Sequence, residues 1–197
     1  MKRRDFVKTL ATSFMAPGLL LSQHTLAADK NAEFWRLAAE GNNLIWWRHP
    51  RTYPGIGDPE GFRLDNCMTQ RRLNAQGRAE ARQIGAVFQT SGVKLDRILS
   101  SAWCRCTEAA DIAFGRHEVW EPINSVFANR DRGPAQTRAV LTAAAQQPAG
   151  ENWILSTHRS NILLATGQNT SMGDVLLTRY DPKQPDQLRV LARLDWR

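Results

Sequence analysis

Two arginines and two histidines in this sequence each follow closely on a short hydrophobic segment. A guanidinium group binds phosphate oxygens through two parallel hydrogen bonds and keeps its charge. A neutral imidazole can attack phosphorus and carry the phosphoryl group, and a second, protonated imidazole can stabilise charge on the equatorial oxygens. The set therefore suits phosphoryl transfer from an ester. Its members are Arg48, His49, Arg105 and His158.

The elements that must position these residues alternate between strands and helices. Apolar runs of strand length stand at 44–47, 97–101 and 152–156. Helical spacing or capping signals mark 74–89 and 102–114, and further helices are expected over 31–40, 134–147 and 160–165. This alternation predicts an α/β fold, a three-layer α/β/α sandwich with a mostly parallel central sheet. Because ligands bind outside the carboxyl ends of such strands, the four residues are expected at one sheet edge.

The rest of the chain completes this picture. A short strand is expected at 118–120, and two final strands at 174–180 and 188–195 are expected to form an antiparallel hairpin. The segment 50–70 is rich in loop-forming residues, and long ordered loops are usually functional. An irregular stretch up to 133 is expected after the short strand. We expect Trp46 and Trp47 to belong to the core. Trp103, beside the predicted site, is assigned to the core or to the pocket wall.

Four segments resemble, in order, the signature segments of the histidine phosphatase superfamily, which includes cofactor-dependent phosphoglycerate mutase. The first, Arg48-His49-Pro50-Arg51-Thr52, is similar to Arg-His-Gly-x-Thr. The second, 73–81, is similar to Leu-Thr-x-x-Gly-x-x-Gln-Ala. The third, 100–107, is similar to Ser-Ser-Pro-Leu-x-Arg-Ala-x-x-Thr. The fourth, 156–162, is similar to the segment that holds the second histidine. The resemblance spans about 44 to 178.

The resemblance implies a role for each residue. His49 would be the nucleophile, Arg48, Arg105 and His158 would complete the phosphate pocket, and Thr52 would assist from the loop. Hydrolysis in the family needs no metal and no organic cofactor. The sequence implies a phosphomonoester hydrolase that works through a phosphohistidine. Its partner is a small-molecule or macromolecular phosphoester substrate, and no basic block indicates nucleic acid.

Two positions depart from the family pattern, and the sequence leaves several candidates for the proton donor. Pro50 replaces a glycine and loses a backbone N–H, and Arg159 replaces the glycine after the second histidine. The preferred proton donor is Asp131, with Glu121 and Glu108 as alternatives. A surface acid paired with neighbouring arginines is the other interpretation of Asp131.

These departures support a second hypothesis: an exported phosphate-ligand binding protein with a non-catalytic pocket. A mutase is disfavoured because the chain is short for the loops that such a reaction needs, and because export would separate it from glycolytic substrates. Specificity is expected to lie in the loops 50–70 and 122–133.

The amino-terminal segment has the pattern of an export signal. Arg3-Arg4, followed by Phe6 and Lys8, resembles the twin-arginine motif, and a weakly apolar stretch leads to a small-x-small site at Ala27. Its apolar run is shorter than the roughly 20 residues of a membrane span. We therefore expect a signal peptide over 1–27, a catalytic domain over 28–197 and a periplasmic location reached through the twin-arginine export machinery.

Three cysteines follow this segment. No histidine pair stands near them at zinc-finger spacing, so no metal site is expected. We predict that Cys67 pairs with Cys104 or Cys106 and ties the long loop to the helix that carries Arg105. Three reduced thiols are the alternative, because cysteine is often buried without a bond.

Overall fold

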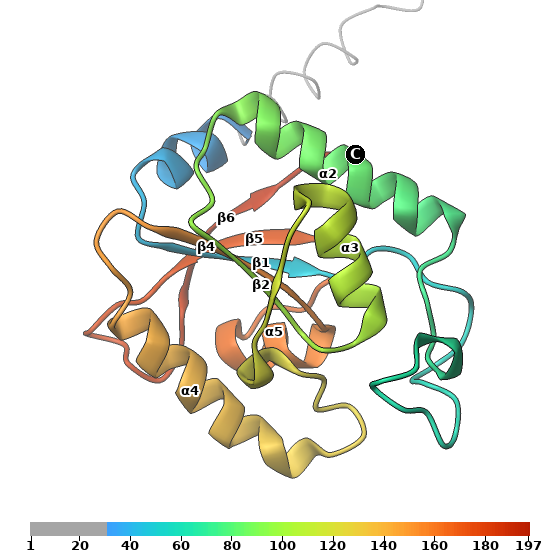
Figure 1. Cartoon of the computed structure of the whole chain (residues 1–197). Coiled ribbons are helices and arrows are strands. Elements are labelled where there is room, and N and C mark those ends of the chain that lie inside the picture. The colour runs from blue at the N-terminus through green and yellow to red at the C-terminus, as the bar shows by residue number, and fades with distance from the viewer. Residues whose placement is uncertain (1–30) are drawn as a thin grey trace, which may run out of the picture.

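The computed structural model describes residues 31–197, so the predicted signal peptide over 1–27 lies outside the described residues. A six-stranded sheet with the order β3-β2-β4-β1-β5-β6 forms its centre (Figure 1). Strands β3, β2, β4 and β1 run parallel, whereas β5 is antiparallel to β1 and to β6. The strands are β1 (Asn43–Arg48), β2 (Arg97–Ser100), β3 (Glu118–Val119), β4 (Asn152–Thr157), β5 (Val175–Arg179) and β6 (Arg189–Leu194).

Helices cover both faces of this sheet, which confirms the predicted three-layer sandwich. The helix over 31–39, α2 and α3 pack on one face, and α4 and α5 pack on the other (Figure 1). None of the helices described is long and apolar enough to cross a membrane. The labelled helices are α2 (Ala75–Ser91), α3 (Cys104–Phe114), α4 (Gly133–Ala145) and α5 (Arg159–Thr166), with short 3-10 turns η1 (Cys67–Thr69), η2 (Glu121–Ile123) and η3 (Arg130–Arg132).

Strand β1 separates the two cores. Successive side chains of a strand point to opposite faces, so Trp47 packs with the α2 and α3 side while Trp46 packs with the α4 and α5 side. Both indole side chains are fully buried, which confirms that they belong to the core. The indole Nε1 of Trp46 donates to Thr178 Oγ1 at 3.2 Å, so its polar atom is satisfied inside the sheet.

The start of α3 differs from the expectation. The helix begins at Cys104 and not at 102, because Trp103 has an extended backbone conformation and Ala102 lies in a bend. The backbone N–H of Ala102 donates to Asn124 Oδ1 at 2.7 Å, and Trp103 occupies the N-cap position. This turn sets where Arg105 leaves the helix.

The amino-terminal turns of α2 hold the chain just after His49. A Cβ atom on Gly77 would lie 1.9 Å from the carbonyl oxygen of Arg51, so only glycine permits this approach. The side chain of Asn74 donates to the Thr52 carbonyl at 3.0 Å. The buried Glu80 accepts the backbone N–H of Arg51 at 3.0 Å and also pairs with its guanidinium. These residues of the 73–81 segment therefore position the loop that leaves β1.

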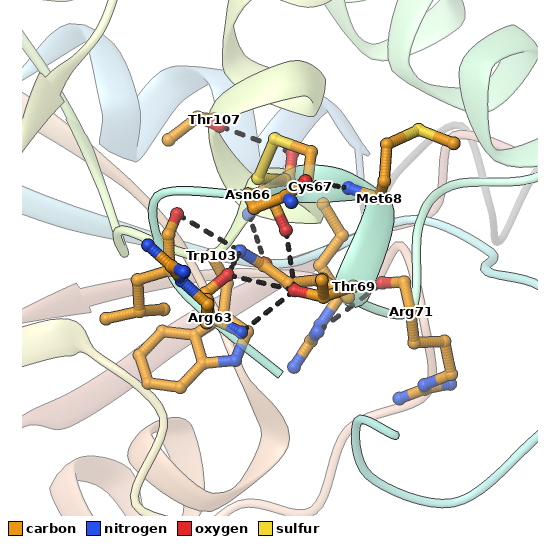
Figure 2. The surroundings of a disulfide bond; sticks show 12 residues. Arg63, Asn66, Cys67, Met68, Thr69, Arg71, Trp103 and Thr107 are labelled. Atoms are coloured by element: carbon orange, nitrogen blue, oxygen red, sulfur yellow. Dashed lines mark hydrogen bonds between the residues drawn. A yellow bond between two sulfur atoms is a disulfide. The ribbon is translucent and has the colours of Figure 1, made fainter. Parts of the chain in front are cut away.

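A disulfide joins Cys67 to Cys104, one of the two predicted pairings (Figure 2). Their Cα atoms lie 5.6 Å apart, and the bond links η1 to the first residue of α3. Gln70 Oε1 accepts the Cys104 N–H at 2.9 Å, which adds a polar contact at the same junction. Restricting the unfolded chain with this bond contributes on the order of 3–4 kcal/mol. Cys106 is free and buried.

Candidate active site

The parallel strands bring the two histidines to one edge of the sheet, as the sequence predicted. The register of β1 against β4 places Arg48 opposite Thr157, so the next residues of both strands leave the sheet side by side. The backbone N–H of His49 donates to the Thr157 carbonyl at 2.9 Å. The rings of His49 and His158 have centroids 5.5 Å apart.

The imidazole of His49 is oriented by its own loop. Its Nδ1 lies 2.9 Å from the carbonyl oxygen of Pro50, and a proton on Nδ1 would complete this hydrogen bond. Nε2 would then be the unprotonated nitrogen. Proline lacks an N–H but keeps its carbonyl, so the replacement of glycine at this position preserves the contact. Burial, and then the charge of Arg105, hold the pKa of His49 well below its usual value.

Arg105 faces an acid that the sequence did not single out. Its guanidinium donates to Asp58 through Nη1–Oδ1 at 2.7 Å and Nη2–Oδ2 at 3.3 Å. The two side chains are only 4% and 8% exposed. The Trp103 indole donates to Asp58 Oδ2 at 2.9 Å, and the Arg71 N–H donates to Oδ1 at 3.0 Å. Asp58 therefore accepts four hydrogen bonds inside the site.

This environment sets the charge of Asp58. Burial raises its pKa, but the hydrogen bonds and charge of Arg105 act in the opposite direction and outweigh it, so the pKa lies below the usual value. Asp58 is therefore a carboxylate in the free protein, and it occupies the guanidinium fork that a phosphate group would use.

His158 is held from two sides. Its Nε2 lies 2.9 Å from Ser101 Oγ, and its Nδ1 lies 3.5 Å from Nη2 of Arg105. Burial, then Arg105 and then His49, lower the pKa of His158 well below its usual value. The imidazole is therefore neutral in the free protein. A bound anion would favour its protonated form.

Two further arginines and Thr52 complete this region. Arg48 donates from Nη1 to the Thr170 carbonyl, and its buried Nε has no hydrogen-bond partner among the described residues. Arg71, which the sequence did not single out, donates from Nη1 to Thr52 Oγ1 at 2.6 Å. Arg48 and Arg71 line the cavity, whereas Thr52 does not, so Thr52 contacts the site through Arg71.

The acids proposed from the sequence lie elsewhere. Asp131 is exposed in η3 and does not line the cavity, although its neighbour Arg130 does. Glu121 pairs with Arg132, and Glu108 pairs with Arg78. Asp58 is thus the acid that the structure brings to the site. Nothing in the sequence separates it from the other acids of the 50–70 loop, because its role depends on where that loop folds.

The cavity at this edge has a volume of about 660 Å³ and is lined by both histidines and five arginines. Among the described residues, no group of three or more histidine, cysteine or acidic side chains could hold a metal ion. Phosphate and phosphate-like anions are the ligands that such a lining fits. The arginines are Arg48, Arg71, Arg105, Arg130 and Arg159.

The fold is similar to that of solved structures from the histidine phosphatase superfamily. Similar solved structures include a putative alpha-ribazole-5'-P phosphatase from Escherichia coli, with 13% identity and a TM-score of 0.54 over 77% of this chain and 96% of that one. A phosphoserine phosphatase mutant from Entamoeba histolytica in complex with phosphoserine matches with 11% identity and a TM-score of 0.53, over 79% and 98%.

A third similar structure is the protein histidine phosphatase SixA complexed with tungstate, with 15% identity and a TM-score of 0.52 over 78% of this chain and 96% of that one. No family model and no curated protein matches the sequence. The structural likeness therefore establishes the fold, while the chemistry has to be argued from the site.

The two depressed histidine pKa values predict a loss of stability in mild acid. In the unfolded chain the imidazoles of His49 and His158 bind protons near pH 6.5, whereas in the folded protein they do not. The free energy of unfolding must therefore fall as the pH drops below about 6.5. For each buried histidine the loss between pH 7.5 and 5.5 is at most about 1.4 kcal/mol, the limit reached when the folded protein binds no proton in this range. Urea denaturation at both pH values should show a smaller loss for His158→Gln than for the wild type. Equal losses would contradict this account.

Proposed function

We propose that this protein hydrolyses phosphomonoesters through a phosphohistidine on His49. The observation that carries the proposal is the orientation of His49, whose Nδ1 faces the Pro50 carbonyl beside a cavity lined by arginines. Oriented in this way, Nε2 is the nitrogen available for attack on phosphorus. The names of the similar structures, which include phosphoserine and protein histidine phosphatases, support the same class of reaction.

Each residue of the site has a distinct role in the proposed reaction. Arg48 and Arg105 bind the phosphoryl oxygens, and Nε2 of His49 attacks phosphorus while the bond to the ester oxygen breaks. His158, which lies beside both, gains a proton when the anion binds and stabilises charge on the equatorial oxygens. Water then cleaves the P–N bond, which releases phosphate and restores the imidazole.

Asp58 is the proton donor in this proposal, in place of Asp131. A phosphate dianion binds the same fork of Arg105 and therefore displaces the carboxylate. Asp58 then loses its cationic partner and gains a dianionic neighbour, and both changes raise its pKa. The protonated acid, still beside the site, gives its proton to the leaving oxygen. As a carboxylate it then accepts a proton from the attacking water.

The contact between Asp58 and the Arg105 guanidinium is also compatible with a second candidate function, that of a phosphate-ligand binding protein without turnover. In such a protein Asp58 would hold Arg105 until an anion replaces it, and no bond to phosphorus would form. Both candidates need Arg105, but only the hydrolase needs His49 as a nucleophile. The next experiment distinguishes them.

His49→Ala should abolish phosphoester hydrolysis, because no other group can form the covalent intermediate. Brief exposure of the wild type to a generic phosphoester should leave acid-labile phosphate on the protein, and the variant should carry none. His117→Ala, a histidine outside the cavity, serves as the control and should label normally. A folded His49→Ala protein with substantial turnover would refute the nucleophile, and an unlabelled, inactive wild type would favour the binding protein.

Asp58→Asn should slow the hydrolysis of alkyl phosphates by about 100-fold or more, the usual contribution of a positioned acid. It should affect 4-nitrophenyl phosphate much less, because that leaving group needs little protonation. The variant should also bind vanadate more tightly, since the amide competes poorly for Arg105. Asp131→Asn is the matched control and should behave as the wild type. Equal losses on both substrates, or a selective loss in Asp131→Asn, would contradict the assignment.

We further propose that the protein is exported to the periplasm by the twin-arginine route. The disulfide supports this location, because such bonds persist in oxidising compartments. Replacing Arg3-Arg4 with Lys-Lys keeps the charge and should leave the precursor unprocessed in the cytoplasm. Wild-type processing in a strain that lacks the twin-arginine translocase would exclude the route.

A further inference from the structure

The cavity continues beyond the phosphate-binding residues along an apolar wall. Its volume of about 660 Å³ lies within the range of pockets that enclose a drug-sized ligand, so it has room for more than a phosphoryl group. The apolar wall is formed by side chains from the 50–70 loop, the 122–133 loop, α5 and the segment before β5. They are Ile56, Val126, Phe127, Leu163, Leu164 and Met172.

Several of these side chains are exposed to solvent although they are large and apolar. Ile56 is 90% exposed, Phe127 53%, Leu164 44% and Leu163 42%. They make up half of the large exposed hydrophobic residues of the described chain. Single exposed hydrophobic residues are ordinary, but a cluster that lines one concave site marks a binding surface.

The wall is held by close backbone contacts. Gly57 has a φ of +73°, and a Cβ atom there would lie 3.1 Å from Cε1 of Phe127. A Cβ atom on Gly133 would lie 2.7 Å from Cδ1 of Leu164. The Phe127 ring and the Leu164 side chain therefore each rest against a glycine of a neighbouring segment, and both line the cavity.

The charged groups define the other side. Apart from Asp58, the ionisable side chains that line the cavity are arginines and two neutral histidines. Arg130 forms no salt bridge within the described residues. A ligand with an anionic end and an apolar body therefore matches the lining, whereas a cationic body does not.

We propose that the substrate is a phosphomonoester with an apolar leaving group, an alkyl or aryl body that packs against Ile56, Phe127 and Leu164. This inference rests on the proposed hydrolase function and narrows its substrate class. The phosphoryl group enters between Arg48 and Arg105, and the ester oxygen faces the apolar wall. Burial of the body there removes apolar surface from water, and this supplies affinity that a hydrophilic leaving group lacks.

The chain-length dependence of hydrolysis tests this directly. We expect kcat/KM to rise at least about twofold per methylene along ethyl, butyl and octyl phosphate, since full burial of a methylene gives about fourfold. Naphthyl phosphate is compared with octyl phosphate to separate aryl from alkyl bodies, and glycerol phosphate is the hydrophilic reference. Phe127→Ser and Leu164→Ser should each weaken this chain-length dependence, which is a ratio of rates measured within one variant.

Val119→Ser is the matched control, because Val119 is 56% exposed on β3 and does not line the cavity. This variant should keep the full chain-length dependence. Hydrolysis that is independent of chain length, or a phosphopeptide that is strongly preferred over every alkyl and aryl ester, would overturn the inference and leave the hydrolase intact.

Binding measurements separate this inference from the proposed function. Alkylphosphonates carry a P–C bond that the reaction does not break, so their affinity reports the cavity alone. Calorimetry should show octylphosphonate binding at least about 60-fold more tightly than ethylphosphonate, which is twofold for each of the six added methylenes, and Phe127→Ser should reduce this difference. If the protein hydrolyses no phosphoester but still binds octylphosphonate more tightly than ethylphosphonate, the apolar site is supported and the proposed hydrolase function is refuted. Equal affinities would overturn the apolar site.

Discussion

The buried pair of Arg105 and Asp58 is the constraint on which the site depends. Two charges removed from water are stable only with good geometry and further hydrogen bonds, and the pair has both: the bidentate contact and donors from Trp103 and Arg71. This pair fixes the 50–70 loop over the sheet edge. The disulfide acts at the same place, since Cys104 is the residue before Arg105 and its partner lies in that loop.

The same pair explains the state of the histidines. One carboxylate faces five arginines in the cavity, so the field at His49 and His158 is positive and both imidazoles are buried. Neutral rings are the form that such surroundings tolerate, and a neutral ring is what a nucleophile requires. In the proposed reaction, an incoming dianion changes the field for every member at once, because it adds negative charge and releases Asp58. Under that proposal, Asp58 occupies in the free protein the place that the substrate anion takes.

The sequence predicts well those features that depend on local pattern. Strand ends, helix caps and the topological rule place His49 and His158 at one edge, and the structure puts them there. The sequence does not identify Asp58, since the 50–70 loop holds three acids and only tertiary folding brings one of them to Arg105. Asp131 does not line the cavity, because its segment reaches the cavity through Arg130. A loop residue's direction is set by contacts that lie far away in the sequence.

The proposed proton donor and part of the apolar wall belong to one short segment of the chain. Ile56, Gly57 and Asp58 are consecutive, so the apolar wall, the contact with Phe127 and the acid share one backbone. If an anion displaces Asp58 from Arg105, the same movement acts on the residues that hold the apolar body. A leaving group that packs against the wall would in turn stabilise the displaced position of the acid. The reaction then depends on the whole substrate and not on its phosphoryl group alone, because binding energy from the remote part serves to place the proton donor.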